Sequence, residues 1–197
     1  MCTAVDLSVA LVHGGRATDV RAIARTLARF GDAALRFAAQ GGIRVVPLGP
    51  ERRYRDASRA LARLGVDVDA WPVPPAGLFV VEERTVLLRC ASPMTVAHEF
   101  GHALDCALGG GVYRSGYDAA VRAAFTAARA FVTPYAATGL DEYFAESLRA
   151  YVGVNDAQSA WPRATRERLA RVDPAMHRFV SELFASEFTA SCCDSSP

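Results

Sequence analysis

Residues 92–111 read Ser92-Pro-Met-Thr-Val-Ala-His-Glu-Phe-Gly-His-Ala-Leu-Asp-Cys-Ala-Leu-Gly-Gly-Gly111. Serine is a favoured N-cap residue and proline is favoured at the first helical position, so Ser92-Pro93 predicts the start of a helix. The three glycines at 109–111 predict its end. This helix divides the chain, because short strands are expected only before it and helices alone after it.

On the N-terminal side, the spacing of apolar residues predicts helices over 19–40 and 55–64 and strands over 43–48, 78–81 and 85–89. On the C-terminal side it predicts helices over 117–132, 141–152 and 173–188. We therefore expect an α+β fold with a small sheet. One domain is expected over 1–190, made of an α/β lobe (1–111) and a helical lobe (112–190), followed by a tail over 191–197.

The composition excludes several classes of protein. Hydrophobic residues make up 51% of the 197 residues, which is typical of a globular core. The net charge is +1 and the basic residues are scattered arginines, so neither nucleic acid nor an anionic membrane is an expected partner. No apolar run is long enough to span a membrane. Because no signal peptide is evident, we expect a cytoplasmic monomer, with secretion only if the chain is a fragment or leaves by a non-standard route.

The helix over 92–108 contains an HExxH motif, His98-Glu99-Phe100-Gly101-His102. Side chains four residues apart share a helix face, about 5–6 Å apart at Cβ, so one Zn²⁺ can be bound by both imidazoles. Glu99 lies beside the metal, where it can take a proton from the zinc-bound water and pass it to a leaving amine. One Zn²⁺ per chain is the expected cofactor.

Zinc needs a third protein ligand, and the motif does not continue as HExxHxxGxxH, because Asp105 and Leu108 occupy those positions. Glu142 and Glu146 share one face of a later amphipathic helix. We assign Glu142 to the zinc and Glu146 to orienting a ligand imidazole, that of His98. Asp141 is the alternative ligand.

Three further features are left open by the residues themselves. Asp105 can orient a histidine or simply be solvated at the helix C-terminus. Tyr135, in the loop before the Glu142 helix, can donate a hydrogen bond to an oxyanion or simply pack. Trp71, in a proline-rich connection, is interpreted as a packed anchor rather than the border of a groove. One strand between residues 78 and 89 is expected to be a sheet edge that can pair with an extended peptide.

The HEFGH motif followed by Tyr135-Ala-Ala-Thr-Gly-Leu-Asp-Glu142-Tyr-Phe-Ala-Glu146 resembles a family of zinc metallopeptidases. That family includes the catalytic domain of anthrax lethal factor and the related bacterial Pro-Pro endopeptidases. In it, a tyrosine precedes a glutamate ligand by seven residues, and the glutamate opens an E-[FY]-F-A-E stretch. The resemblance covers about residues 78–184 and implies a zincin-like fold.

By this resemblance, His98, His102 and Glu142 are the zinc ligands, Glu99 is the base and Tyr135 is the transition-state donor. The expected activity is hydrolysis of a peptide or protein substrate by an endopeptidase. Two alternatives stay open: a zinc hydrolase that processes a small or modified peptide, and an inactive peptidase fold that serves as a binding module.

Overall fold

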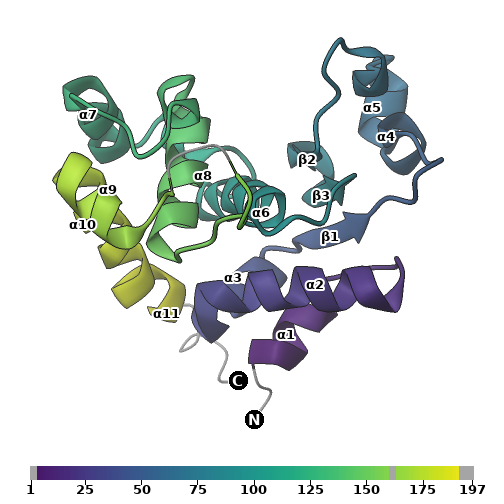
Figure 1. The fold of residues 1–197 in the computed structure, drawn as a ribbon, viewed down its shortest axis with the longest axis horizontal. Coiled ribbons are helices and arrows are strands. Elements are labelled where there is room, and N and C mark those ends of the chain that lie inside the picture. The colour runs from purple at the N-terminus through teal and green to yellow at the C-terminus, as the bar shows by residue number, and fades with distance from the viewer. Residues whose placement is uncertain (1–3, 160–162, 191–197) are drawn as a thin grey trace.

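The computed structural model describes residues 4–159 and 163–190; the tail expected over 191–197 lies outside this range. Two helices, α6 (Pro93–Leu108) and α8 (Leu140–Tyr151), pack against each other at the centre of the molecule (Figure 1). The sheet lies on one side of this pair and the C-terminal helices on the other. The helix predicted from Ser92-Pro93 is confirmed, and the Ser92 hydroxyl accepts the Thr95 N–H as an N-cap.

The sheet has three short strands, β1 (Arg44–Pro47), β2 (Gly77–Val80) and β3 (Thr85–Leu88), in the order β1-β3-β2. β3 pairs parallel with β1 and antiparallel with β2, and the short 3₁₀ turn η3 (Val81–Glu83) joins β2 to β3. β2 therefore lies at one edge, and both β2 and β3 contact α6. This answers the question that the sequence left open, since β2 is the edge strand beside the HExxH helix.

The N-terminal helices are shorter than predicted. The pattern over 19–40 contains a break at Gly31, whose φ of 81° lies outside the helical region. The pattern over 55–64 breaks at Ser58, which is extended and caps the second piece. The elements are α1 (Ala4–Ala10), α2 (Ala17–Leu27), η1 (Ala28–Phe30), α3 (Gly31–Gln40), α4 (Tyr54–Ala57), α5 (Arg59–Leu64) and η2 (Val68–Ala70).

Among the described residues after α6, all regular elements are helical, as predicted. The helix predicted over 117–132 is too long, however, because α7 ends at Ala127. Phe125 and Phe131 pack together with ring centroids 5.3 Å apart, whereas on one straight helix they would lie about 120° apart around the axis and about 9 Å apart along it. The elements are η4 (Arg114–Gly116), α7 (Ala119–Ala127), η5 (Tyr135–Ala137), α9 (Arg166–Val172), α10 (Pro174–Glu182), a π-helical turn (Leu183–Glu187) and α11 (Phe188–Ala190).

The main hydrophobic core draws on residues from Leu11 to Phe188 and includes Phe100 of α6 and Phe144 of α8. A smaller cluster lies under α4 and α5 on the far side of the sheet. Burial of both central helices fixes their spacing and their rotation. The α+β class is confirmed, and the positions of α6 and α8 determine the geometry of the candidate site.

Candidate active site

The two histidines of the motif lie close together on the side of α6 that faces α8. His98 Nε2 and His102 Nε2 lie 3.1 Å apart, and the two ring centroids are 4.7 Å apart. Both imidazoles are largely buried, with side-chain exposures of 13% and 7%. The spacing of four residues therefore produces the shared face that the sequence predicts.

Helix α8 brings Glu142 to the same point. Glu142 Oε2 lies 3.0 Å from His98 Nε2 and 3.4 Å from His102 Nε2. The ligand atoms that these three residues offer all lie within 4.8 Å of one another. Asp141, the alternative ligand, is not part of this group. Glu142 Oε2 is buried and faces both imidazole nitrogens, a position in which it can share a cation with them.

The charges around His98 favour a cation in this group. Burial alone would lower the pKa of His98, but hydrogen bonds with Glu142 and Glu146 raise it to about 10. Burial would raise the pKa of Glu142, yet hydrogen bonds with His102 and His98 lower it to about 2. Two imidazole nitrogens and a carboxylate oxygen are a donor set that metal ions such as zinc accept. The three residues therefore form a possible metal-binding group.

Glu146 lies behind His98, on the side away from Glu142. Its Oε1 is 3.0 Å from His98 Nδ1, so the carboxylate contacts the ring nitrogen that does not face the donor group. Burial would raise the pKa of Glu146, but hydrogen bonds from Arg149 and His98 hold it far below its usual range. An ionised carboxylate here fixes the orientation and tautomer of the imidazole.

Glu99 lies one residue around α6, against the start of strand β2. Its side chain is buried, and burial raises its pKa even though His98 and His102 act in the opposite direction. The Phe79 backbone also hydrogen-bonds to it. A Cβ at Gly77 would lie 2.6 Å from Glu99 Cγ, so only glycine leaves room for this side chain. A carboxylate with a raised pKa suits the transfer of protons near neutral pH.

Tyr135 belongs to the short turn η5 and lies beside the metal-binding group, next to Glu142 and His98. Its hydroxyl donates to Glu142 Oε1 at 3.0 Å, and its ring centroid is 5.4 Å from that of His98. The side chain is 40% exposed. Burial of the phenol and the adjacent Glu142 raise the pKa of Tyr135, so the hydroxyl remains a proton donor at neutral pH.

Asp105 has a partner other than those expected. It is fully buried, and its two oxygens accept the Ser115 backbone N–H at 2.9 Å and the Ser115 hydroxyl at 2.5 Å. It hydrogen-bonds to neither imidazole, and His102 Nδ1 is buried without a hydrogen-bond partner among the described residues. Solvation at the helix C-terminus is also wrong for Asp105, because the residue is fully buried.

A cavity of about 640 Å³ opens beside the group. The residues that line it include His98, Glu99 and Tyr135, together with Trp71 and Val73. The interpretation of Trp71 as a packed anchor is wrong, since 53% of its side chain is exposed and it borders this cavity.

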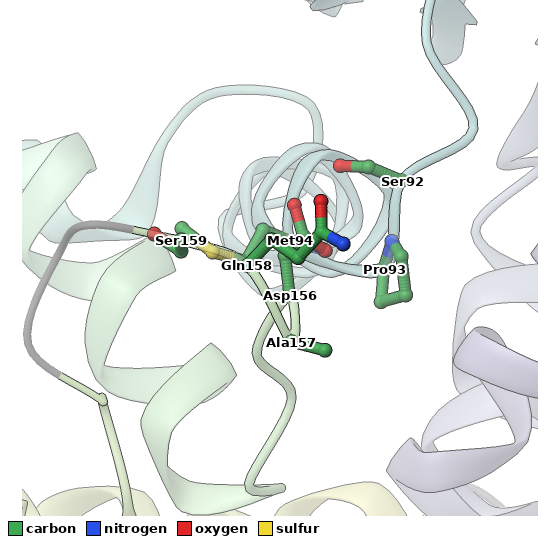
Figure 2. A pocket seen from close by; sticks show the side chains of 7 residues that line it. All are labelled: Ser92, Pro93, Met94, Asp156, Ala157, Gln158 and Ser159. Carbon is green, nitrogen blue, oxygen red and sulfur yellow. The ribbon is translucent and has the colours of Figure 1, made fainter.

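A second hollow lies at the N-terminal end of α6 and is drawn in Figure 2. It is lined by Ser92, Pro93, Met94 and residues 156–159, and Asp156 Oδ1 accepts the Met94 N–H at 2.9 Å. Neither histidine nor Glu99 reaches it. Of these two hollows, the cavity beside Trp71 is the one lined by His98, Glu99 and Glu146.

Three residues at the site are missing from the sequence-based prediction. Gly77 makes room for Glu99, Arg149 holds Glu146, and Thr133 joins Glu146 to the Tyr135 turn. The sequence contains a partial signal for Arg149, three residues after Glu146 on one helix, and for Thr133, which precedes a turn. Gly77 carries no such signal, because Glu99 is far from it in sequence.

Among the described residues, no helix has the length and apolar character needed to cross a membrane. Comparison with known proteins gives no matching family model and no matching curated protein. Among solved structures, the chain is similar to the Pro-Pro endopeptidase of Paenibacillus alvei, with a TM-score of 0.64 and 19% identity. The match covers 90% of this chain and 99% of the other. The chain thus shares the fold of a Pro-Pro endopeptidase.

Proposed function

We propose that this protein is a zinc-dependent endopeptidase with one zinc ion per chain, bound by His98, His102 and Glu142. The observation that carries the proposal is the convergence of these three ligand atoms within 4.8 Å, next to an acidic side chain and a phenol. Two nitrogens and one oxygen leave a fourth position open, which is typical of catalytic rather than structural zinc sites. The fold similarity to an endopeptidase supports peptide hydrolysis.

Zinc would supply Lewis-acid chemistry, polarising a peptide carbonyl and lowering the pKa of water. Glu99 takes a proton from the attacking water and returns it to the leaving nitrogen, a role that fits its raised pKa and its place beside His98. Tyr135 donates a hydrogen bond to the oxyanion that forms on the attacked carbonyl. Glu146 keeps the His98 ring in the orientation that ligation requires.

The substrate is an extended peptide chain. Strand β2 is an edge of the sheet and contacts α6, so a peptide that adds to this edge passes Glu99. The cavity between Tyr135 and Trp71 then receives side chains of that peptide. Apolar residues dominate the Trp71 wall, so we expect apolar side chains near the cleaved bond.

The test combines metal analysis with digestion of a diverse peptide library, read by mass spectrometry. We expect about one zinc per chain and cleavage at internal bonds. Glu99→Gln should keep the zinc and reduce kcat by about 10²–10⁴, the usual contribution of a general base. Glu82→Gln is the matched control, because Glu82 is an exposed glutamate paired with Arg63. Full activity in Glu99→Gln, or a metal-free wild type that cleaves no peptide, would contradict the proposal; the second result would favour a binding module.

A further inference from the structure

The carboxylate of Glu146 is saturated with hydrogen bonds. Its Oε1 contacts His98 Nδ1 at 3.0 Å and accepts from Arg149 Nε at 2.8 Å. Its Oε2 accepts from Arg149 Nη2 at 2.7 Å and from the Thr133 hydroxyl at 2.6 Å. A carboxylate offers about four lone-pair positions, so all of them are used. Each partner therefore restricts where this carboxylate, and with it the His98 ring, can lie.

Arg149 holds both oxygens of the Glu146 carboxylate. Only 1% of its side chain is exposed, and the two-pronged contact with Glu146 balances its buried charge. Its remaining nitrogen, Nη1, donates to the Val154 carbonyl at 2.8 Å. Arg149 thus ties Glu146 to the main chain after α8, which prevents the carboxylate from turning away from His98.

Thr133 makes a different connection, because it joins Glu146 to the turn that carries Tyr135. Its hydroxyl donates to Glu146 and accepts the Ala136 N–H at 3.2 Å, within the first turn of η5. The Thr133 side chain is buried, so water does not replace either bond readily. The position of η5 is consequently coupled to the position of Glu146.

These contacts close a ring around the metal-binding group. Tyr135 donates to Glu142 at 3.0 Å, and Glu142 lies 3.0 Å from His98 Nε2. His98 contacts Glu146, and Thr133 leads back from Glu146 to the Tyr135 turn. A displacement of the tyrosine turn therefore reaches His98 by two routes, one through Glu142 and one through Thr133.

We infer that Thr133 is a positioning residue for the reaction: its hydroxyl fixes the Tyr135 turn to Glu146, so that the phenol and the His98 ligand keep one relative placement. Arg149 holds the Glu146 carboxylate in place, so Thr133 joins the Tyr135 turn to a group that is itself fixed. This inference rests on the proposed function. Thr133 touches neither the metal-binding atoms nor the cavity, so it acts only through Tyr135 and Glu146.

The test is a double-mutant cycle of Thr133→Val and Tyr135→Phe, measured as kcat/KM on one cleaved peptide. Valine has nearly the shape of threonine but no hydroxyl. Removing a group that orients ligands costs on the order of 10–100-fold in activity or metal affinity, so we expect a loss in that range, chiefly in kcat. In the Tyr135→Phe background the phenol is already absent and Arg149 still holds Glu146, so Thr133→Val should then cost less than about threefold.

Three controls make the cycle decisive. Thr133→Ser keeps a hydroxyl and should restore most of the activity. Thr138→Val removes an exposed hydroxyl near the same turn. It should change little, because the Thr138 hydroxyl bonds to the Tyr135 carbonyl and not to Glu146. Zinc content and thermal unfolding are measured for every variant. Equal losses in both backgrounds, or no loss in either, would overturn the role of Thr133 while leaving the proposed function intact. Failure of the proposed function itself would be visible in the wild type, which would then lack zinc or cleavage.

Discussion

Gly101 of α6 lies directly against Ala145 of α8, and a Cβ added to the glycine would be 2.9 Å from the Ala145 Cα. This is closer than side chains normally approach a backbone, so the two helices cross at a distance that only glycine permits. The crossing lies between the two histidines on one helix and between Glu142 and Glu146 on the other. The fourth residue of the HEFGH motif is therefore what lets the third ligand reach the imidazoles.

We predict that Gly101→Ala separates α6 from α8 by a few tenths of an ångström and weakens zinc binding. Overpacking of this kind typically costs about 1–3 kcal/mol, although alanine elsewhere in a helix is more stable than glycine. Urea unfolding and chelator competition measure the two effects. Gly116→Ala is the control, since an added Cβ at Gly116 meets no atom within 4 Å. Equal effects of the two substitutions would show that the crossing is not tight.

Gly77→Ala should reduce turnover while leaving zinc and fold in place. The new methyl group would lie 2.6 Å from Glu99 Cγ and 2.8 Å from Thr95 Cγ2, so the glutamate has to move. A displacement of about 1 Å in a reacting group can cost on the order of 10²-fold, which sets the expected loss in kcat/KM. Gly49→Ala is the matched substitution, because its Cβ would contact nothing. A variant with wild-type kcat would show that Glu99 need not occupy its observed place.

Tyr135→Phe should slow cleavage by about 10²–10³, the usual effect of removing one oxyanion donor. Zinc content should not change, because the phenol contacts Glu142 Oε1 and not the oxygen that faces the imidazoles. Steady-state kinetics and metal analysis on the same samples measure both quantities. Tyr117→Phe, at another exposed tyrosine, controls for loss of a hydroxyl in general. Loss of zinc from Tyr135→Phe would instead assign the tyrosine to the structure of the site.

Asp105 should make the protein less stable as the pH rises from about 4 to about 6. Burial raises its pKa to about 6, which the hydrogen bonds from Ser115 offset only in part, whereas an aspartate in an unfolded chain titrates near 4. Between these values the folded state binds a proton that the unfolded state has released, so the free energy of unfolding falls with increasing pH. The fall is on the order of 3 kcal/mol for a shift of this size.

Asp105→Asn stays neutral and should remove this part of the pH dependence. The measurement is urea unfolding of both proteins at pH 4 and pH 7, compared as a difference so that other titrating groups cancel. The exposed Asp56 provides the control substitution Asp56→Asn. A difference between wild type and Asp105→Asn that is the same at both pH values would show that folding does not raise the pKa of Asp105.

Much of the site follows from local rules. The i, i+4 spacing of His98 and His102 guarantees a shared face on any helix, and Ser92-Pro93 guarantees that a helix begins there. Glu142 and Glu146 obey the same rule on α8. The sequence pattern predicts neither the break at Gly31 nor the early end of α7, because apolar residues keep their helical spacing through both positions.

The order of residues along the chain sets which side chains share a helix face, because helix geometry depends only on neighbours along the chain. Tertiary structure alone decided which of these faces meet. The crossing at Gly101 and Ala145, the choice of β2 as the edge strand and the bond between Asp105 and Ser115 all join residues brought together by packing. Such contacts depend on how buried surfaces fit in three dimensions, and residue spacing carries no record of that fit.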